Sequence, residues 1–364
     1  MDERSVEYGC LLIDAHRTRW SNVYSRHAGN LAKNFHTYLK CTETMSIKIV
    51  IYGQIGGEEE TIRAIQSVAP DATVVKATQE TLAADLADAE IFYGFHTPEV
   101  FRDAKRLRWI QAQAAGLDRM LEAELVERGL IITNASGVHA PQVAEAAWAL
   151  TLAISRGMPT YFRQQQEHVW KWTTLQDLDG ATAGIIGLGG IGRRYARIAA
   201  AVGMRVIAVD LHATTKPEEV ESLWPMERIE SMLAASDVVL VSCPYTPETR
   251  RLINSERLWQ MKSSAILVNI SRGGIVDEQA LCEVLQNGHL RGAGLDVTET
   301  EPLPADSPLW DTPRLVITPH CAGISPGRNR RLTEFFCENL RRYLAGESLA
   351  NVIDQKRGYP VPSA

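Results

Sequence analysis

The chain has 364 residues, of which 45% are hydrophobic and 23% charged, so it can bury a substantial core and has the length of about two domains. Its formal net charge of -6 and isoelectric point near 5.9 give no electrostatic case for binding nucleic acid or an anionic membrane. No uninterrupted apolar run reaches the roughly 18 residues that a membrane helix needs.

Residues 1–44 differ from the rest of the chain because they show no sustained helical or strand period. The acidic start, MDERS, fits neither a secretory signal nor a transit peptide. Met45 directly precedes SIKIVIYG, which is typical of a first strand. We therefore expect the fold to begin near Met45, with residues 1–44 as a disordered or loosely packed extension, or as sequence upstream of the true start. The alternative is a segment ordered by docking on the body or on a partner subunit.

From Met45 to about Asn134 the pattern predicts alternating strands and helices. The expected strands are 47–52, 72–76, 91–93, 109–111 and 131–133, and the expected helices are 58–68, 81–87, 98–104 and 117–127. Repeated β-α units of this length predict a parallel, doubly wound sheet. The glycines at 56 and 57 lack the spacing and the acid of a phosphate-binding loop, so this first domain is expected to bind no nucleotide of its own.

His139–Ser155 predicts one long apolar helix that is entered through Pro141. Apolar residues surround nearly its whole circumference, which indicates burial on most sides, as a domain connector, a subunit interface, or both. The segment 158–172 that follows is rich in aromatic residues. We expect these to pack rather than to line a site: Tyr161, Phe162, Trp170 and Trp172.

The strongest motif lies between Ala183 and Asp210. A short apolar strand, 183–186, precedes glycines at G-x-G-x-x-G spacing, and a helix is expected from about Gly190 to Val202. A second strand, 205–209, then ends on Asp210. This strand–turn–helix context with a following acid is what a dinucleotide fingerprint requires. The glycines are Gly187, Gly189 and Gly192, and the expected apolar helix face is Ile191, Tyr195, Ile198 and Val202.

Each part of this motif has a mechanical role. Gly187 permits the tight turn, Gly189 lets the backbone approach a pyrophosphate, and Gly192 allows the helix to pack closely on the strand. The helix N-terminus presents free N–H groups and the positive end of its dipole to the phosphates. Asp210 can accept hydrogen bonds from both ribose hydroxyls and would repel a 2′-phosphate, which favours NAD(H) over NADP(H).

After Asp210 the alternation resumes, with expected strands at 237–242, 265–269, 294–297 and 315–317 and helices at 255–261, 277–287 and 328–345. The last helix carries a basic face, which we expect to be solvated: Arg328, Arg330, Arg331, Arg341 and Arg342.

Polar residues follow three of these strands directly, where open α/β sheets bind ligands. Arg272 precedes two glycines and can present its guanidinium fork to a carboxylate. Glu299 and Glu301 follow the next strand, and His320 follows the last strand after Thr318-Pro319. Histidine titrates near neutrality, which suits an acid/base role.

From about Met45 to Asp354 the chain resembles the NAD-dependent D-isomer-specific 2-hydroxyacid dehydrogenase family. The resemblance is carried by five motifs in family order: GLGGIG at Gly187, PYTPETR at Pro244, NISRGGIVDE at Asn269, GLDVTETEPLP at Gly294 and ITPH at Ile317. It implies a Rossmann cofactor domain, 141–321, inserted into a flavodoxin-like substrate domain, 45–140 and 322–364. Both are doubly wound parallel α/β domains, with the active site in the cleft between them.

The resemblance implies a catalytic trio of Arg272, Glu301 and His320. His320 would be the acid/base, Glu301 would hold its tautomer, and Arg272 would bind the carboxylate and polarise the carbonyl of a 2-oxo acid. Glu299 competes with Glu301 for the partner role, and the family places its acid directly before the proline, which favours Glu301.

Cofactor and substrate contacts carry over from the resemblance as well. Gly190 and Ile191 would offer amides to the pyrophosphate. The contacts to the adenine, ribose and carboxamide would come from Cys243, Pro244, Thr246, Ile270 and Asp296. One departure is Ser242, where relatives often carry histidine; we expect a local change at the cofactor rim without consequence for hydride transfer. For the substrate, the loop 114–116 would offer backbone N–H groups, and the expected contacts are Ala115, Gly116, Phe95 and His96, with a plain surface-loop position as the alternative for His96.

The predicted function is reversible reduction of a 2-oxo acid to a D-2-hydroxy acid by NADH, in a homodimer formed through the helix 139–155. Glyoxylate, hydroxypyruvate, phosphoglycerate-type and branched acids all remain open as substrates. Phosphite oxidation and a non-enzymatic NAD(H)-sensing module of the corepressor type are the alternatives. Formate oxidation is disfavoured because formate-oxidising relatives lack the glutamate at the position of Glu301.

The six cysteines form no C-x-x-C pair, so we predict free thiols in the cytoplasm and no metal site.

Overall fold

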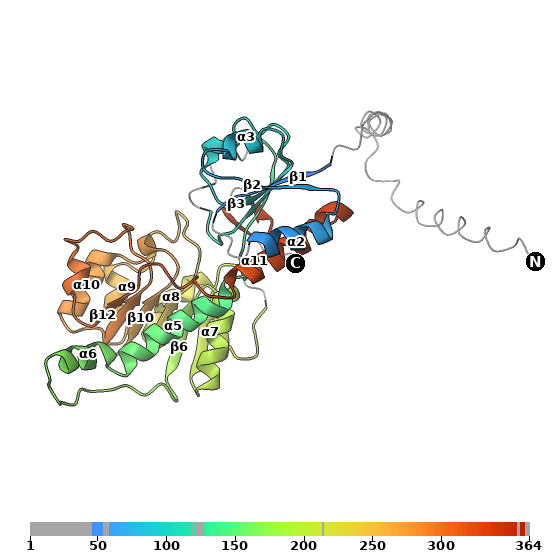
Figure 1. The fold of residues 1–364 in the computed structure, drawn as a ribbon. Helices are drawn as coiled ribbons and strands as arrows, with labels where there is room; N and C mark the ends of the chain where they lie inside the picture. Colours follow the sequence, from blue (N-terminus) through green and yellow to red (C-terminus); the bar gives the residue numbers. More distant parts are fainter. Residues whose placement is uncertain are drawn as a thin grey trace, which may run out of the picture. The chain divides into compact units, whose positions relative to one another are not determined.

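The computed structural model describes residues 46–53, 58–117, 120, 125, 127–212, 215–354 and 357–360. The predicted extension at residues 1–44, the glycine pair at 56 and 57, and most of the helix expected at 117–127 lie outside the described residues. In the described part, two parallel sheets carry the fold (Figure 1). This confirms the predicted class of two doubly wound α/β domains.

The first sheet has five parallel strands in the order β2-β1-β3-β4-β5. This is the flavodoxin-like order that the resemblance implies. The strands are β1 (Lys48–Ile51), β2 (Thr73–Lys76), β3 (Ile91–Gly94), β4 (Trp109–Ala112) and β5 (Ile131–Thr133).

Helices cover both faces of this first sheet. On one face α2 (Glu58–Val68) lies beside α11 (Arg328–Ala345), which comes from the far end of the chain (Figure 1). The ring of Phe336 on α11 stacks on Tyr93 of β3 with 4.2 Å between centroids. The other face is covered by α3 (Leu82–Leu86) and the short 3₁₀ helix η1 (Pro98–Phe101). The C-terminal helix is therefore part of the core of the first sheet.

The second sheet has seven parallel strands in the order β12-β11-β10-β9-β6-β7-β8. Counted from β6, this is the Rossmann order 3-2-1-4-5-6 with one further strand, and the order reverses between β6 and β9. The strands are β6 (Thr182–Ile186), β7 (Arg205–Val209), β8 (Ser222–Trp224), β9 (Val238–Val241), β10 (Ile266–Asn269), β11 (Gly292–Leu295) and β12 (Leu315–Ile317).

Two hydrophobic layers sandwich this second sheet. One contains α5 (Ala140–Ser155) and α7 (Gly190–Ala201), which pack on each other and on the sheet. The other contains α8 (Ile229–Ala235), α9 (Ser255–Gln260) and α10 (Glu278–Gln286). Short 3₁₀ turns complete the layer: η2 (Met226–Arg228), η3 (Gly273–Ile275) and η4 (Pro308–Asp311). Within the described residues, no helix has the length and apolar character that crossing a membrane requires.

A short antiparallel hairpin follows α11. It consists of β13 (Ile353–Asp354) and β14 (Tyr359–Pro360), in which Ile353 pairs with Pro360 and Asp354 with Tyr359. An isolated bridge between Val352 and Thr133 ties its start to the first sheet. No period predicted this hairpin, because each strand has only two residues.

Several predicted elements differ from the structure. The helix expected at 98–104 is only η1, which ends at Phe101. The face expected for the helix after the glycine loop is wrong at Val202, which is 41% exposed because the helix ends at Ala201. Strand β8 and helix α8 were not predicted.

The aromatics after α5 are expected to pack rather than to line a site, but three of the four do not pack within this chain. The side chains are 57% exposed at Phe162, 98% at Trp170 and 89% at Trp172. Tyr161, on α6 (Met158–Gln166), is partly buried, and its hydroxyl accepts the backbone N–H of Thr173 at 3.4 Å. Helix α5 itself buries one side and leaves the other exposed, at Glu145, Ala149 and Leu152.

Candidate active site

The glycine loop after β6 has the backbone geometry that the fingerprint needs. Gly187 adopts φ +93°, and a β-carbon there would lie 2.6 Å from the backbone nitrogen of Cys243. At Gly192 a β-carbon would lie 2.2 Å from the carbonyl oxygen of Gly187, so the helix packs on the turn only because this residue is glycine. A β-carbon at Gly189 would have no atom of the described residues within 4 Å, which leaves the backbone open to a ligand.

Asp210 sits beside this loop at the end of β7. Its two carboxylate oxygens accept the backbone N–H groups of Leu188, at 2.6 Å, and of His212, at 2.7 Å. The carboxylate is thereby held against the glycine loop. Helix α7 begins directly after this loop, at Gly190, and Ile191 is its second residue. A free helix N-terminus beside a fixed carboxylate fits the pyrophosphate and ribose of a dinucleotide.

The loop after β9 closes on the same glycines. The hydroxyl of Ser242 donates to the carbonyl oxygen of Gly187 at 2.8 Å, so the residue that departs from the family pattern is a link between the two loops. Cys243 is buried, and burial raises the pKa of its thiol to about 12, which makes it a packing residue rather than a nucleophile. Pro244 and Thr246 form the turn that follows, where Thr249 donates to the carbonyl of Pro244 at 2.8 Å.

His320 and Glu301 are brought into direct contact. Nδ1 of His320 lies 2.7 Å from Oε2 of Glu301, and the other oxygen of Glu301 accepts the backbone N–H of Thr298 at 3.2 Å. The imidazole side chain is 47% exposed, whereas that of Glu301 is 27% exposed. Since Nδ1 is engaged, Nε2 is the nitrogen left to meet a substrate. Glu299, the competing carboxylate, shows no such contact with the histidine.

Asp296 holds the segment that carries His320. It is 2% exposed, and its carboxylate accepts the hydroxyl of Thr318 at 2.5 Å and the N–H groups of Cys321 and Ala322 at 3.0 Å each. His320 itself adopts φ +51°, a conformation that is uncommon for a residue other than glycine. Asp296 is predicted as a cofactor contact, and the sequence did not indicate that it also has these structural partners.

Arg272 lies in the turn after β10. Its Nη1 donates to the carbonyl oxygen of Ser271 at 2.8 Å. The turn is shaped by Asn269, whose side chain is fully buried, accepts the N–H of Ser271 at 3.1 Å and donates to the carbonyl of Arg272 at 2.8 Å. This role of Asn269 was not predicted, although an asparagine at the end of a strand is a common signal for such a turn. The next residue in the chain, Ile270, is buried.

The turn with Arg272 packs directly on the segment with Glu301. A β-carbon at Gly273 would lie 1.9 Å from the carbonyl carbon of Thr298 and 2.2 Å from the nitrogen of Glu299. Backbone therefore touches backbone here, and only glycine permits this approach. The two loops that carry Arg272 and Glu301 are fixed relative to each other by this contact.

Glu278, in the first turn of α10, is a further carboxyl group at this site. Its carboxylate accepts the backbone N–H of Glu299. Burial raises the pKa of Glu278 to about 7, and the negative charges of Glu299, Glu301 and Asp277 add to the increase, while the hydrogen bond from Glu299 opposes it. No sequence pattern indicates this partnership, because the two groups come from different loops.

The residues predicted to touch substrate lie in the first sheet, at the ends of β3 and β4. Asn134 is buried and donates to the carbonyl oxygen of Ala115, next to Gly116, which fixes this loop. Phe95 packs partly against the core. His96 lies against the ring of Tyr52, with 5.4 Å between centroids.

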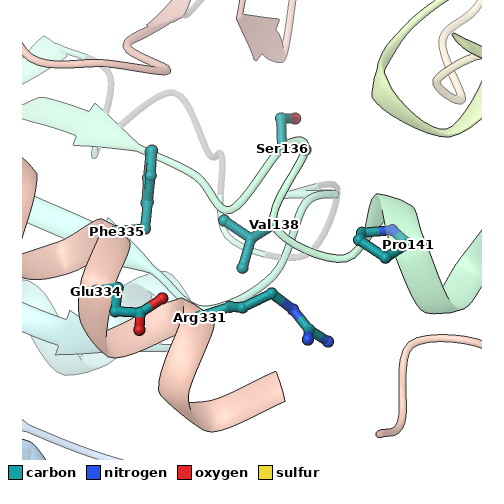
Figure 2. Close-up of a pocket in the computed structure, with 7 residues that line it drawn as sticks. Ser136, Val138, Pro141, Arg331, Glu334 and Phe335 are labelled. Carbon is teal, nitrogen blue, oxygen red and sulfur yellow. The ribbon is translucent and has the colours of Figure 1, made fainter. Parts of the chain in front are cut away.

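A pocket of about 390 Å³ lies near the start of α5 (Figure 2). Ser136 and Val138 come from the preceding loop and Pro141 from the first turn of α5, while the opposite wall belongs to α11. On that wall the guanidinium group of Arg331 is already hydrogen-bonded, because it donates to the side-chain oxygen of Gln142 at 2.8 Å. None of the predicted site residues lines this pocket. Among the described residues, no group of three or more His, Cys, Asp or Glu is placed to hold a metal ion.

Comparison with known proteins identifies the class to which this fold and site belong. The family model described as "D-isomer specific 2-hydroxyacid dehydrogenase, NAD binding domain" matches residues 148–322. A glyoxylate reductase of Korarchaeum cryptofilum is 38% identical over 266 residues, which cover 71% of this chain and 79% of that protein. The chain belongs to the D-isomer specific 2-hydroxyacid dehydrogenase family, as the resemblance predicted.

Two further relatives show how far the similarity extends. A D-3-phosphoglycerate dehydrogenase of Mycobacterium tuberculosis is 36% identical over 259 residues, but they cover 70% of this chain and only 48% of that protein. The crystal structure of a family member from Xanthobacter autotrophicus Py2, in complex with NADPH and MES, has 31% identity and a TM-score of 0.75, and the match covers 86% of this chain and 100% of that one. The chain thus spans about half the length of that phosphoglycerate dehydrogenase.

Proposed function

We propose that this chain is an NAD(H)-dependent D-2-hydroxyacid dehydrogenase of the glyoxylate/hydroxypyruvate reductase type. The observation that carries the proposal is the 2.7 Å contact between Nδ1 of His320 and Oε2 of Glu301, at the carboxyl edge of a sheet with a dinucleotide fingerprint. The glyoxylate reductase of Korarchaeum cryptofilum supports the substrate class, because this chain covers 79% of it.

Each residue of the trio has a task in this proposal. Glu301 holds Nδ1 of His320, so the proton on Nε2 is the one given to the carbonyl oxygen of the 2-oxo acid and recovered in the reverse direction. Arg272 binds the carboxylate and polarises the adjacent carbonyl, as a planar fork of donors can. Backbone N–H groups near Ala115 and Gly116, with Phe95 and His96 beside them, complete the substrate contacts.

The nicotinamide, when bound, supplies or accepts the hydride. In this proposal the amides of Gly190 and Ile191 would hold the pyrophosphate, beside the turn of Gly187, Gly189 and Gly192. Asp210 favours NAD(H), because a fixed carboxylate accepts the ribose hydroxyls and repels a 2′-phosphate. The rest of the nucleotide would lie along the loops after β9, β10 and β11, with contacts from Cys243, Pro244, Thr246, Ile270 and Asp296.

The proposal is tested by the NADH-dependent reduction of a panel of 2-oxo acids, followed by the loss of NADH absorbance. Glu301→Gln should lower kcat by up to about 10²–10⁴-fold, the range of the general acid/base contribution of His320 that Glu301 supports, while NADH still binds. Glu299→Gln is the matched control, because Glu299 lies two residues away and does not contact His320. Equal effects of the two substitutions would contradict the proposal.

The panel also separates the alternatives. Phosphite is included as a donor, since a similar trio could serve its oxidation. If wild type turns over phosphite but no 2-oxo acid, the chain is a phosphite-type dehydrogenase. NADH-dependent partner binding without turnover of any substrate would instead favour a sensing module of the corepressor type.

We further propose a homodimer in which the exposed side of α5 and the segment after α6 face a second copy. Trp170 and Trp172 support this, because two nearly fully exposed tryptophans are unusual on the surface of a monomer. Light scattering should give twice the mass of one chain.

The proposed function also divides the chain into a substrate domain, 45–140 and 322–364, and a cofactor domain, 141–321. The described cysteines are free thiols, which suits the proposed cytoplasmic setting.

A further inference from the structure

The C-terminal hairpin is attached to the first sheet but reaches the second. Val352 bridges to Thr133 at the end of β5, and Ile353 is buried. Asn351 donates from its side chain to the carbonyl oxygens of Asn134, at 3.2 Å, and Ser136, at 2.7 Å. The base of the hairpin is therefore well anchored.

Strand β14 of the hairpin contacts the loop after β7. The hydroxyl of Tyr359 lies 2.8 Å from Nε2 of His212, and the two rings are tilted against each other with 5.8 Å between centroids. The backbone N–H of the same His212 donates to Oδ1 of Asp210 at 2.7 Å. A chain of two hydrogen bonds thus runs from Tyr359 through His212 to Asp210.

The electrostatic surroundings of Tyr359 are consistent with this placement. Burial raises the pKa of the Tyr359 hydroxyl; the positive charge of Arg357 opposes the increase, and the negative charges of Glu248, Asp210 and Asp354 add to it. The hydroxyl therefore keeps its proton at neutral pH. It can serve as a stable partner for the imidazole of His212.

We propose that Tyr359 is a positioning residue of the nucleotide site: through His212 it holds Asp210 where the carboxylate receives the adenosine ribose. The C-terminal hairpin thereby sets the affinity for NADH and the preference for NADH over NADPH. Without the hydrogen bond between Tyr359 and His212, the loop after β7 is less restrained, and the carboxylate of Asp210 can move away from the ribose. Binding of NADH then weakens, and the repulsion of a 2′-phosphate weakens with it. This inference rests on the nucleotide site proposed above.

The test is Tyr359→Phe, which keeps the ring and removes the hydroxyl. Loss of one neutral hydrogen bond of about 1 kcal/mol predicts roughly fivefold weaker binding of NADH. Binding of NADPH should change less, so the ratio of the two dissociation constants shifts toward NADPH. At saturating NADH, kcat should change less than the dissociation constant of NADH, because the trio is not touched directly. Both dissociation constants are measured by titrating the full-length protein with each nucleotide.

Tyr343→Phe is the matched control. Its hydroxyl also makes a 2.8 Å hydrogen bond, to Oε1 of Glu90, but on α11 at the first sheet. A second variant, His212→Phe, removes the imidazole partner and should reproduce the shift of Tyr359→Phe. An NADH dissociation constant within twofold of wild type for Tyr359→Phe, or an equal change for Tyr343→Phe, would overturn the inference.

Asp210→Ala separates the inference from the proposed site. If Asp210→Ala weakens NADH binding and Tyr359→Phe does not, the site stands and the role of the hairpin is refuted. If Asp210→Ala leaves both nucleotides bound as in wild type, the ribose contact itself is wrong, and the proposed role of Tyr359 is overturned with it.

Discussion

Gly273→Ala is the sharpest test of how the candidate active site is assembled. A β-carbon at this position would lie 1.9 Å from the carbonyl carbon of Thr298, whereas two carbon atoms prefer about 3.5–4.0 Å. The turn with Arg272 and the segment with Glu301 must therefore separate by about 1.5 Å or more. Because a misplacement of about 1 Å can cost about 10²-fold in rate, we expect kcat/KM to fall at least a hundredfold.

The adjacent glycine provides the control. A β-carbon at Gly274 would meet the ring of Tyr245 at 3.0 Å, and a partly exposed side chain can move where a backbone cannot. Gly274→Ala should therefore keep most of the activity. Gly273→Ala should also lower the free energy of unfolding by about 1–3 kcal/mol, as overpacking does, which thermal unfolding would show. An alanine at 273 with wild-type stability and kcat/KM would refute the close approach of the two loops.

Two further predictions concern carboxylates of the site. Glu278→Gln removes a carboxyl group whose pKa in the folded protein, about 7, lies above that of an unfolded glutamate. The protonated carboxyl group therefore stabilises the folded wild type at low pH, and this contribution is lost as the pH rises. Between about pH 4.5 and 7.5, the free energy of unfolding of the variant should increase relative to that of wild type, as denaturant unfolding would show. Three hydrogen-bond donors face the carboxylate of Asp296, so the NH₂ group of Asp296→Asn would meet donors instead of acceptors. The free energy of unfolding should therefore fall by about 1–3 kcal/mol. The exposed Asp71→Asn, as control, should change little, and equal stability of the two Asn variants would contradict the role of Asp296.

Much of the fold was predictable because it follows from local pattern. Apolar strands and amphipathic helices alternate over most of the chain, and a parallel sheet is the arrangement that such alternation allows. The glycine loop was predictable for the same reason, since its turn, its helix and Asp210 are close in sequence. The positions of Arg272 and His320 followed from strand ends, and their roles from the family resemblance.

The contacts that position these residues could not be predicted in the same way. Glu278 meets Glu299, and Asp296 meets the segment of Cys321, across separations of more than twenty residues. No periodicity encodes such a pair. The exposure of Trp170 was missed for a related reason: an apolar side chain indicates burial, but not whether a residue of the same chain or of another covers it.

The contacts between neighbouring loops form a continuous series along one edge of the second sheet. Gly187 after β6 packs on Cys243 after β9, whose carbonyl accepts the hydroxyl of Ser271 after β10. Gly273 then packs on the segment after β11, and Asp296 in that segment holds the loop after β12. Since each link joins strands that are adjacent in the sheet, a shift in one loop displaces its neighbour. The nucleotide loop and the imidazole are thus mechanically coupled, so substitutions at any link should change cofactor affinity and turnover together.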